Sequence, residues 1–309
     1  MFRLLSMLTL MIAVAKNTTG YQLSLKQELH YAKKGSIKLP NVFPSSTIKY
    51  LKSSCLIHIK ENELSAYQQK LSAILDVPMS SVTSKYPTLK SCKSAINSHV
   101  TSIPFLQYFN LHLTHSSIKT LTSSPLLPTL ASKLMSSKTL RLYQTSLFYK
   151  RKNDASTLWH SDLKMSPFDT NKFVTFWIPL TEISKESTLE FVDESHLDFA
   201  LPFWNNANVD LSTRQGYDNI QQYALKLGDL TAHNGWTLHS APPNFDSKDR
   251  LALTVSYVDG EARVREGFGD KVNDRGDGED EMSYGRWIDT VKEGKRIPSN
   301  HKDMPLIKC

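Results

Sequence analysis

The spacing of apolar residues in the first part of the chain predicts mainly helices. Between Glu61 and Leu75 they recur every three to four positions, the pattern of an amphipathic helix. A second helix is predicted over Pro125–Met135, because proline is favoured in the first turn. The denser apolar run Leu51–Ile59 predicts a strand, and residues 20–48 predict a short helix followed by an irregular arm.

From residue 139 onward the pattern changes to short runs of apolar and β-branched residues separated by turn signals. Strands are predicted over Thr139–Lys150, Phe173–Leu180, Thr188–Val192, Tyr223–Leu227, Trp236–His239 and Leu251–Val258. Many short strands at this spacing are typical of a β-sandwich or jelly roll. We therefore expect a mainly β fold with flanking helices.

Length and composition fit one catalytic domain. The chain has 309 residues, of which 40% are hydrophobic and 22% charged, as in ordinary globular proteins. We expect a single domain over residues 20–309, with a mixed N-terminal part (20–138), a β core (139–260) and a C-terminal loop and tail (261–309). Within that tail, the acidic and glycine-rich stretch Glu266–Tyr284 is expected to be a mobile loop.

The first residues resemble a targeting signal rather than part of the fold. A short basic start is followed by the apolar run Leu4–Ala15, which ends in the small-x-small sequence Ala13-Val14-Ala15. This pattern predicts a secretory-type signal peptide over residues 1–15, with a buried N-terminal helix or strand as the alternative. The run is shorter than the ~20 apolar residues that span a bilayer. We expect the secretory pathway or an organelle lumen, with the cytoplasm as the alternative.

The charge pattern bears on the expected partners, and the cysteine content on a possible disulfide. The net charge is +7, but lysines and arginines are scattered singly, so we expect a basic soluble surface and no nucleic-acid partner. We also expect a monomer and a small-molecule substrate. A modest positive field also suits an anionic co-substrate. Of the three cysteines, Cys55 and Cys92 are the plausible disulfide pair in an oxidising compartment, because Cys309 ends the chain.

The most informative polar pattern is His160-Ser161-Asp162. Two side chains two residues apart on extended backbone project to the same side, so both can ligate one metal ion. Such a pair is also common on surface strands, and a third ligand must come from elsewhere. The segment Gly228–Ser240 offers both His233 and His239. Two histidines and one carboxylate leave three positions of an octahedron open, as in non-haem Fe(II) oxygenases.

Two further features point to an anionic ligand. Arg250 lies within an apolar run, eleven residues after His239, and a buried guanidinium requires a carboxylate partner from a ligand or from the protein. In the run Thr139–Lys150, one face of the predicted strand carries Gln144, Ser146, Phe148 and Lys150. A polar, aromatic and cationic face suits a barrel interior that holds an anionic co-substrate and a polar substrate; solvent exposure is the alternative.

Taken together, His160-Ser161-Asp162, His239 and Arg250 resemble the phytanoyl-CoA dioxygenase family, which includes the ectoine hydroxylases. The resemblance covers roughly residues 120–260 and, more weakly, Trp287–Leu306. Further matching stretches are Leu142–Lys150, Phe173–Leu180, Leu189–Val192 and Ser195-His196. The turns depart from the family pattern: Glu186-Ser187 stands for the usual Asn-Gly, and Asp193-Glu194 for the usual Pro-Gly.

The resemblance implies a double-stranded β-helix (jelly-roll, cupin-like) core and an Fe(II)- and 2-oxoglutarate-dependent dioxygenase that consumes O2. Iron would be held by His160, Asp162 and His239; His239 is preferred to His233 because of its distance from Arg250. The far carboxylate of 2-oxoglutarate would be bound by Arg250, with Lys150 nearby. The substrate would meet Gln144, Ser146 and Phe148.

The expected reaction is oxidation of an unactivated C–H bond in a small organic substrate. The outcome would be hydroxylation, or oxidative cyclisation or desaturation; a weaker resemblance to ring-forming kainoid synthases implies natural-product biosynthesis. The alternatives are an inactive binding module on the same fold, a nucleic-acid demethylase, and a zinc hydrolase. The first would be expected to lack a ligand or the arginine, the second to show a basic groove with stacking aromatics, and the third leaves Arg250 and Lys150 without a purpose.

Overall fold

The computed structural model describes residues 20–198, 219–266 and 278–309. The predicted signal peptide lies outside the described residues, as does the part of the predicted mobile loop from 267 to 277. In the part of the chain that is described, no helix is long and apolar enough to cross a bilayer.

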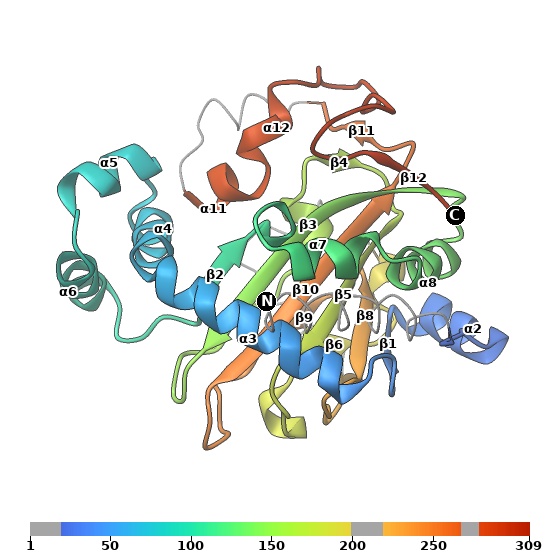
Figure 1. The fold of residues 1–309 in the computed structure, drawn as a ribbon, viewed down its shortest axis with the longest axis horizontal. Helices are drawn as coiled ribbons and strands as arrows, with labels where there is room; N and C mark the ends of the chain where they lie inside the picture. The colour runs from blue at the N-terminus through green and yellow to red at the C-terminus, as the bar shows by residue number, and fades with distance from the viewer. Residues whose placement is uncertain (1–19, 199–218, 267–277) are drawn as a thin grey trace, which may run out of the picture.

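A curled antiparallel sheet of seven strands forms the centre of the molecule (Figure 1). Its order is β1-β8-β5-β10-β3-β12, and β2 also pairs with β3. The strands of this large sheet are β1 (Ser36–Leu39), β2 (Leu106–Phe109), β3 (Thr139–Lys150), β5 (Phe173–Pro179), β8 (Leu230–Asn234), β10 (Arg250–Asp259) and β12 (Leu306–Lys308).

Two smaller sheets complete the β structure. A three-stranded sheet has the order β7-β6-β9, and β11 pairs with β4. Their strands are β4 (Phe168–Asp169), β6 (Glu190–Val192), β7 (Ile220–Gln222), β9 (His239–Ser240) and β11 (Arg263–Val264). Trp177 and Ala252 of the large sheet share a buried cluster with Phe191 of β6. The two sheets therefore pack face to face, which confirms the predicted jelly-roll core.

Helices cover the other face and one edge of the large sheet. Figure 1 shows α3, α7 and α8 across that face and α4, α5 and α6 together at the edge beyond β2. The helices are α2 (Leu25–Lys34), α3 (Ser45–Glu61), α4 (Glu63–Leu75), α5 (Met79–Lys85), α6 (Leu89–His99), α7 (Ser116–Ser123), α8 (Leu126–Met135), α11 (Gly278–Asp280) and α12 (Arg286–Ile288). Short 3-10 turns are η1 (Leu111–Leu113), η2 (Asp162–Met165), η3 (Lys185–Ser187) and η4 (Ser195–Asp198), and η6 (Glu281–Gly285) is a π-helix.

Alternation along β10 separates the core from the interior between the sheets. Leu251, Leu253, Val255 and Tyr257 all belong to the main core, under the helices. Because side chains alternate along a strand, Arg250, Ala252, Thr254 and Ser256 point the other way. In β3 the residues paired with these four are Lys150, Phe148, Ser146 and Gln144. The predicted shared face of β3 thus lines the interior between the sheets.

The helices predicted at residues 61–75 and 125–135 are confirmed as α4 and α8. The strand predicted over Leu51–Ile59 is wrong, because this run lies inside α3. Leu51 and Cys55 are buried while Ile57 is 57% exposed, which is a helical and not an alternating pattern. The apolar residues on its exposed side made the run look continuous.

Strands β3, β5, β6 and β10 are found where predicted, within one or two residues. Tyr223–Leu227 is not a strand: it forms two isolated bridges, between Leu225 and Ile183 and between Leu227 and Asp229. The run Trp236–His239 is extended only at its end, because the backbone turns at Asn234, whose carbonyl accepts from the Thr237 N–H at 2.9 Å.

The prediction of a mobile loop is also wrong for its last residues, because 278–284 are helical. They pack on α4: the Gly278 N–H donates to the Ser72 hydroxyl at 2.7 Å, and Lys70 forms an ion pair with Glu279. The expected Cys55–Cys92 disulfide is not formed. All three cysteines are free, and burial raises the pKa of the Cys55 thiol to about 12.

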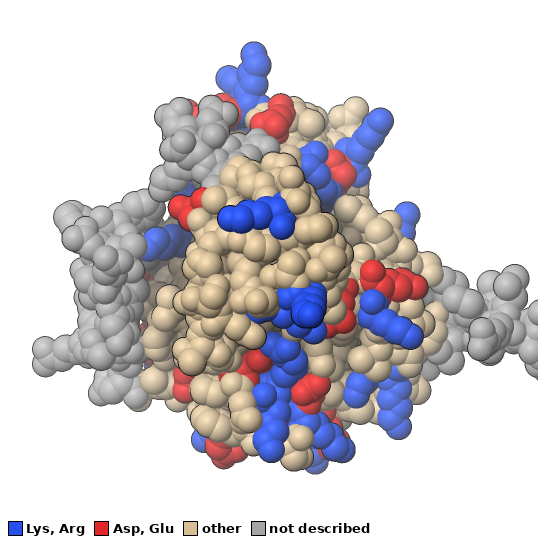
Figure 2. Space-filling model, turned by 90° about the vertical axis from the view of Figure 1, so that its left-hand side faces the viewer, with Lys and Arg blue, Asp and Glu red and all other residues tan. Residues whose placement is uncertain are grey.

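Charge is mixed on the face shown in Figure 2, which is the side of α4, α5 and α6. Lysines and arginines stand there among acidic residues and wide uncharged areas. Lysines and arginines are densest in the lower half of this view, where acidic residues stand among them.

Candidate active site

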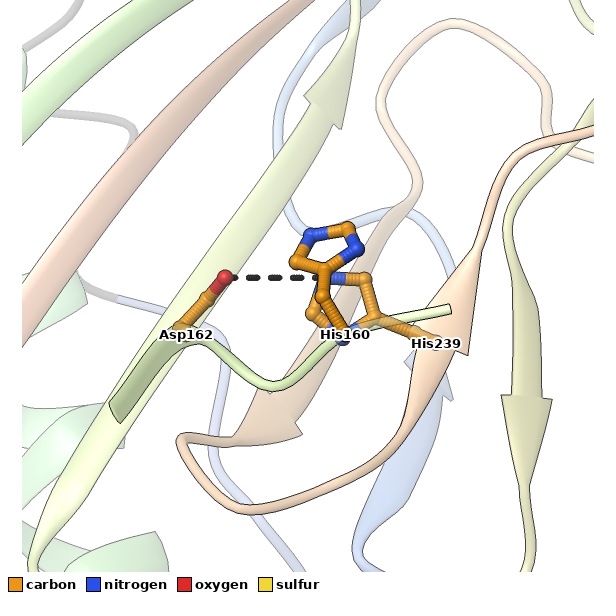
Figure 3. A group of neighbouring side chains, drawn as sticks. All are labelled: His160, Asp162 and His239. Carbon is orange, nitrogen blue, oxygen red and sulfur yellow. Dashed lines mark ion pairs between the residues drawn. The ribbon is translucent and has the colours of Figure 1, made fainter. Parts of the chain in front are cut away.

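His160 and His239 are joined through their backbones. The His160 N–H donates to the His239 carbonyl at 3.0 Å, and the His239 N–H donates to the His160 carbonyl at 2.9 Å. This antiparallel bridge connects the His-x-Asp segment to β9 and brings the two imidazole rings to a centroid separation of 4.2 Å. Two positions distant in sequence are thus fixed side by side (Figure 3).

Backbone carbonyls orient both imidazoles through their Nδ1 atoms. His160 Nδ1 lies 2.8 Å from the Leu158 carbonyl, and His239 Nδ1 lies 2.9 Å from the Thr237 carbonyl. A carbonyl only accepts, so each Nδ1 donates a hydrogen and each Nε2 is the ring nitrogen left to face a metal. Burial, followed by the charges of His160 and His233, holds the pKa of His239 well below its usual value, which favours the neutral ring.

Asp162, at the start of η2, uses its two oxygens differently. Oδ2 accepts a hydrogen bond from the Thr175 hydroxyl at 2.6 Å and another from His233 Nε2 at 3.1 Å. Oδ1 lies 3.5 Å from His239 Nε2. Burial works to raise the pKa of Asp162, but the surrounding imidazoles, among them His233 with its hydrogen bond, hold it well below its usual range. The carboxylate is therefore ionised.

These side chains form one compact donor set. A carboxylate oxygen of Asp162 and one ring nitrogen each of His160 and His239 lie within 4.8 Å of one another. His233 is excluded from this set because its Nε2 faces the carboxylate oxygen Oδ2 instead. Two imidazole nitrogens and one carboxylate oxygen suit a divalent transition metal such as Fe(II). The donors present therefore fit the metal that the sequence pattern implied.

A cationic pair lies at the far end of the same interior face. Arg250 begins β10 and is paired in register with Lys150, which ends β3; their side chains are buried, with exposures of 6% and 1%. Arg250 Nη1 donates to the Ser187 carbonyl and Lys150 Nζ to the Ala155 carbonyl. Among the described residues, no carboxylate forms an ion pair with either.

Burial governs the charge of this pair. Burial, followed by the charge of Arg250, lowers the pKa of Lys150 to about 7, and burial lowers that of Arg250 to about 10. Asp246 acts to raise the pKa of Arg250, and Asp154 that of Lys150. Neither carboxylate forms an ion pair with the cation it acts on, and Asp154 pairs with Arg151 instead. Buried cations without a paired carboxylate are unfavourable unless an anion joins them. The site is thus suited to an anionic ligand.

Neutral polar groups line the middle of β3. Gln144 Nε2 donates to the Ser146 hydroxyl at 2.7 Å, which also accepts from Gln107 Nε2 at 3.2 Å. Gln144 Oε1 accepts from the Ser283 hydroxyl at 2.6 Å. Phe148 packs edge-on against Phe105, with ring centroids 5.1 Å apart. The residues expected near a substrate thus belong to one hydrogen-bonded and aromatic wall.

Sequence reasoning missed several members of this arrangement. Gln107 and Ser283 come from β2 and η6, in segments where the sequence offered no strand or motif. Thr175 had a weak signal, since it is the only hydroxyl residue in the apolar run Phe173–Pro179. His233 was recognised only as a competing ligand.

Comparison with known proteins identifies the family. The family model described as phytanoyl-CoA dioxygenase (PhyH) matches residues 58–252. This begins well before the roughly 120–260 of the sequence resemblance and leaves out the weaker C-terminal part. A search of curated protein sequences gave no significant match.

Solved structures share the fold over most of their length. The 2-oxoglutarate-dependent carbocyclase SnoK from nogalamycin biosynthesis has a TM-score of 0.65 at 16% identity, covering 93% of this chain and 97% of its own. The epimerase SnoN from the same biosynthesis has a TM-score of 0.63 at 20% identity, covering 92% and 98%. EctD from S. alaskensis with bound Fe has a TM-score of 0.57 at 14% identity, covering 81% and 82%. Because the family model matches well over half of the chain, the chain belongs to the phytanoyl-CoA dioxygenase (PhyH) family of non-haem iron, 2-oxoglutarate-dependent oxygenases.

Proposed function

We propose that this protein is an Fe(II)- and 2-oxoglutarate-dependent dioxygenase that oxidises an unactivated C–H bond of a small organic substrate. One observation carries the proposal. The same interior holds a donor set of two imidazoles and one carboxylate and, apart from it, two buried cations without an ion-paired carboxylate among the described residues. A bound metal ion accounts for the donor set, and a bound anionic co-substrate accounts for the two buried cations.

Each side chain then has a defined task. His160 and His239 would each hold Fe(II) through one ring nitrogen, and Asp162 through one carboxylate oxygen. The Arg250 guanidinium binds the far carboxylate of 2-oxoglutarate in a two-point contact, and Lys150 adds a second positive charge. When bound, iron and 2-oxoglutarate together activate O2 for attack on a C–H bond. The wall formed by Gln144, Ser146 and Phe148 meets the substrate.

The fold is compatible with several reaction outcomes. Structures that share it include a protein described as a carbocyclase, one described as an epimerase, and EctD crystallised with 2-oxoglutarate and 5-hydroxyectoine. We propose hydroxylation, or oxidative cyclisation or desaturation, of a small polar natural-product precursor. Kainoid-type ring closure of an amino-acid-like chain is one such reaction. The amide and hydroxyl groups beside Gln144 favour a polar substrate over a purely hydrocarbon one.

A turnover screen tests the proposal. The protein is supplied with Fe(II), 2-oxoglutarate, O2 and a panel of small polar compounds, and succinate is measured. Products are then examined by mass spectrometry, because hydroxylation adds one oxygen atom while cyclisation or desaturation removes two hydrogen atoms. Asp162→Ala serves as the inactive control and His30→Ala, an exposed histidine, as the matched active one. Succinate formation that Asp162→Ala leaves intact would contradict the proposal.

We also propose that residues 1–15 direct the chain into the secretory pathway or an organelle and are then removed. The basic start, the apolar run and the Ala13-Val14-Ala15 ending support this. N-terminal sequencing of the native protein is expected to begin after residue 15. Native protein that begins at Met1 and fractionates with the cytosol would contradict it.

A further inference from the structure

The carboxylate of Asp162 is held on one side by two buried groups of the large sheet. Thr175 on β5 and His233 on β8 are register partners on neighbouring strands, and both contact Oδ2. Their exposures are 4% and 1%, so both donor groups are shielded from bulk water. The second oxygen, Oδ1, is left facing His239 Nε2 at 3.5 Å.

The hydrogens in this arrangement can be assigned by chemistry alone. An ionised carboxylate only accepts, so the single hydroxyl hydrogen of Thr175 and the Nε2 hydrogen of His233 both point to Oδ2. Thr175 Oγ1 also lies 3.0 Å from the Ser256 hydroxyl on β10, and Ser256 must be the donor there. Ser256 is in turn the register partner of Thr175. The result is a directed chain from Ser256 through Thr175 to Asp162, closed from the other side by His233.

We propose that Thr175 and His233 are positioning residues that restrict Asp162 to binding the metal through Oδ1 alone, and that Ser256 orients the Thr175 hydroxyl. The inference rests on the proposed function. A carboxylate can bind a metal through one or both oxygens. In a site that must offer three open positions, a second oxygen would take one of them. Two charge-assisted hydrogen bonds on Oδ2 keep that oxygen away from the metal.

Isosteric pairs of variants isolate this role. Thr175→Val removes the hydroxyl but keeps the branched shape, while Thr175→Ser keeps the donor. His233→Leu removes the ring N–H, while His233→Gln keeps an N–H at similar reach. Ser256→Ala acts one hydrogen bond further away and disturbs packing least. Thermal unfolding of each metal-free variant is measured first, so that loss of the fold is not mistaken for loss of the site.

The readout is Co(II) binding, followed by the visible spectrum of the bound ion, which reports its coordination. Removing such an outer partner of a metal ligand typically lowers metal affinity by roughly 10- to 100-fold. We expect that loss, with a changed Co(II) spectrum, in Thr175→Val and His233→Leu. Thr175→Ser and His233→Gln should stay close to the parent, and Ser256→Ala should show a smaller change in the same direction. The double variant Thr175→Val with His233→Leu should lose less Co(II) affinity than the two single losses combined, because both donors bind the same carboxylate oxygen.

The parent protein separates this inference from the proposal beneath it. If the parent takes up no Co(II), the proposed function and the inference both fail. If the parent binds one Co(II) per chain, and folded Thr175→Val, His233→Leu and Ser256→Ala keep its affinity and spectrum, the positioning role alone is overturned.

Discussion

Lys150, the last residue of β3, and Arg250, the first residue of β10, are register partners, and both are buried without an ion-paired carboxylate among the described residues. Their proximity lowers the pKa of Lys150, after the larger effect of burial. The pair therefore has a ligand-dependent charge, and this leads to two predictions about co-substrate binding.

The affinity for 2-oxoglutarate is expected to fall as the pH rises through about 7, because the pKa of Lys150 lies at about 7. Below that pH the free protein already has both cations, while above it Lys150 is neutral and must take up a proton when the anion binds. The loss is at most ~tenfold per pH unit, the limit for one linked proton. Calorimetry of the Co(II)-loaded protein in buffers of different ionisation enthalpy measures the proton uptake. Lys150→Met should abolish this dependence, and a parent affinity that is flat above pH 7 would contradict the assignment.

Arg250→Ala should weaken 2-oxoglutarate binding without loss of metal. Truncating one partner of a buried charge pair costs about 2–5 kcal/mol, and 1.4 kcal/mol is tenfold, so the dissociation constant should rise by roughly 30- to several-thousand-fold. Arg250→Lys keeps the charge but not the two-point contact, and should be intermediate. Arg263→Ala, on the exposed side of β11, is the matched control. Unchanged 2-oxoglutarate binding in Arg250→Ala would remove the main support for the co-substrate site.

Stability should distinguish helix from strand in the run Leu51–Ile59. Leu51 is 2% exposed and Ile57 is 57% exposed, although a strand would place both on one face. Leu51→Ala should therefore lower the free energy of unfolding by about 2–5 kcal/mol, and Ile57→Ala by less than about 0.5 kcal/mol. Chemical denaturation measures both changes. Equal losses would favour the strand that the sequence predicted.

Thiol counting tests the free cysteines. Cys309 is exposed while Cys55 and Cys92 are buried, so one thiol per chain should react quickly in the native protein. All three should react after denaturation without a reductant. Only one reactive thiol under both conditions would show that Cys55 and Cys92 are bonded after all.

The parts predicted best from the sequence depend on local spacing. The alternation along β3 placed Gln144 and Lys150 on one interior face, because a strand repeats every two residues. The separation of His160 from Asp162 was equally local. In α3 the local signal misled, because Leu56 and Ile57 are exposed apolar residues that mask the helical spacing of the buried ones.

What could not be predicted depends on pairing between strands. The sequence around Thr175 does not indicate that His233 and Ser256 lie beside it. They do so because β5 pairs with both β8 and β10. Ser283 likewise reaches Gln144 only because η6 folds back across 139 residues of chain. The sequence preferred His239 to His233 by its distance from Arg250, but it gave no sign of the backbone bridge that places His239 beside His160.

The most direct test of the central claim is titration of metal-free protein with Fe(II) under argon, followed by addition of 2-oxoglutarate and measurement of visible absorption. The parent and His30→Ala are expected to bind one iron per chain and to become coloured when 2-oxoglutarate joins it. His160→Ala and His239→Ala are expected to do neither, and His233→Ala is expected to keep a weaker iron site. If His239→Ala still binds one iron per chain and develops the parent's absorption with 2-oxoglutarate, then His160, Asp162 and His239 do not form the iron site of this protein.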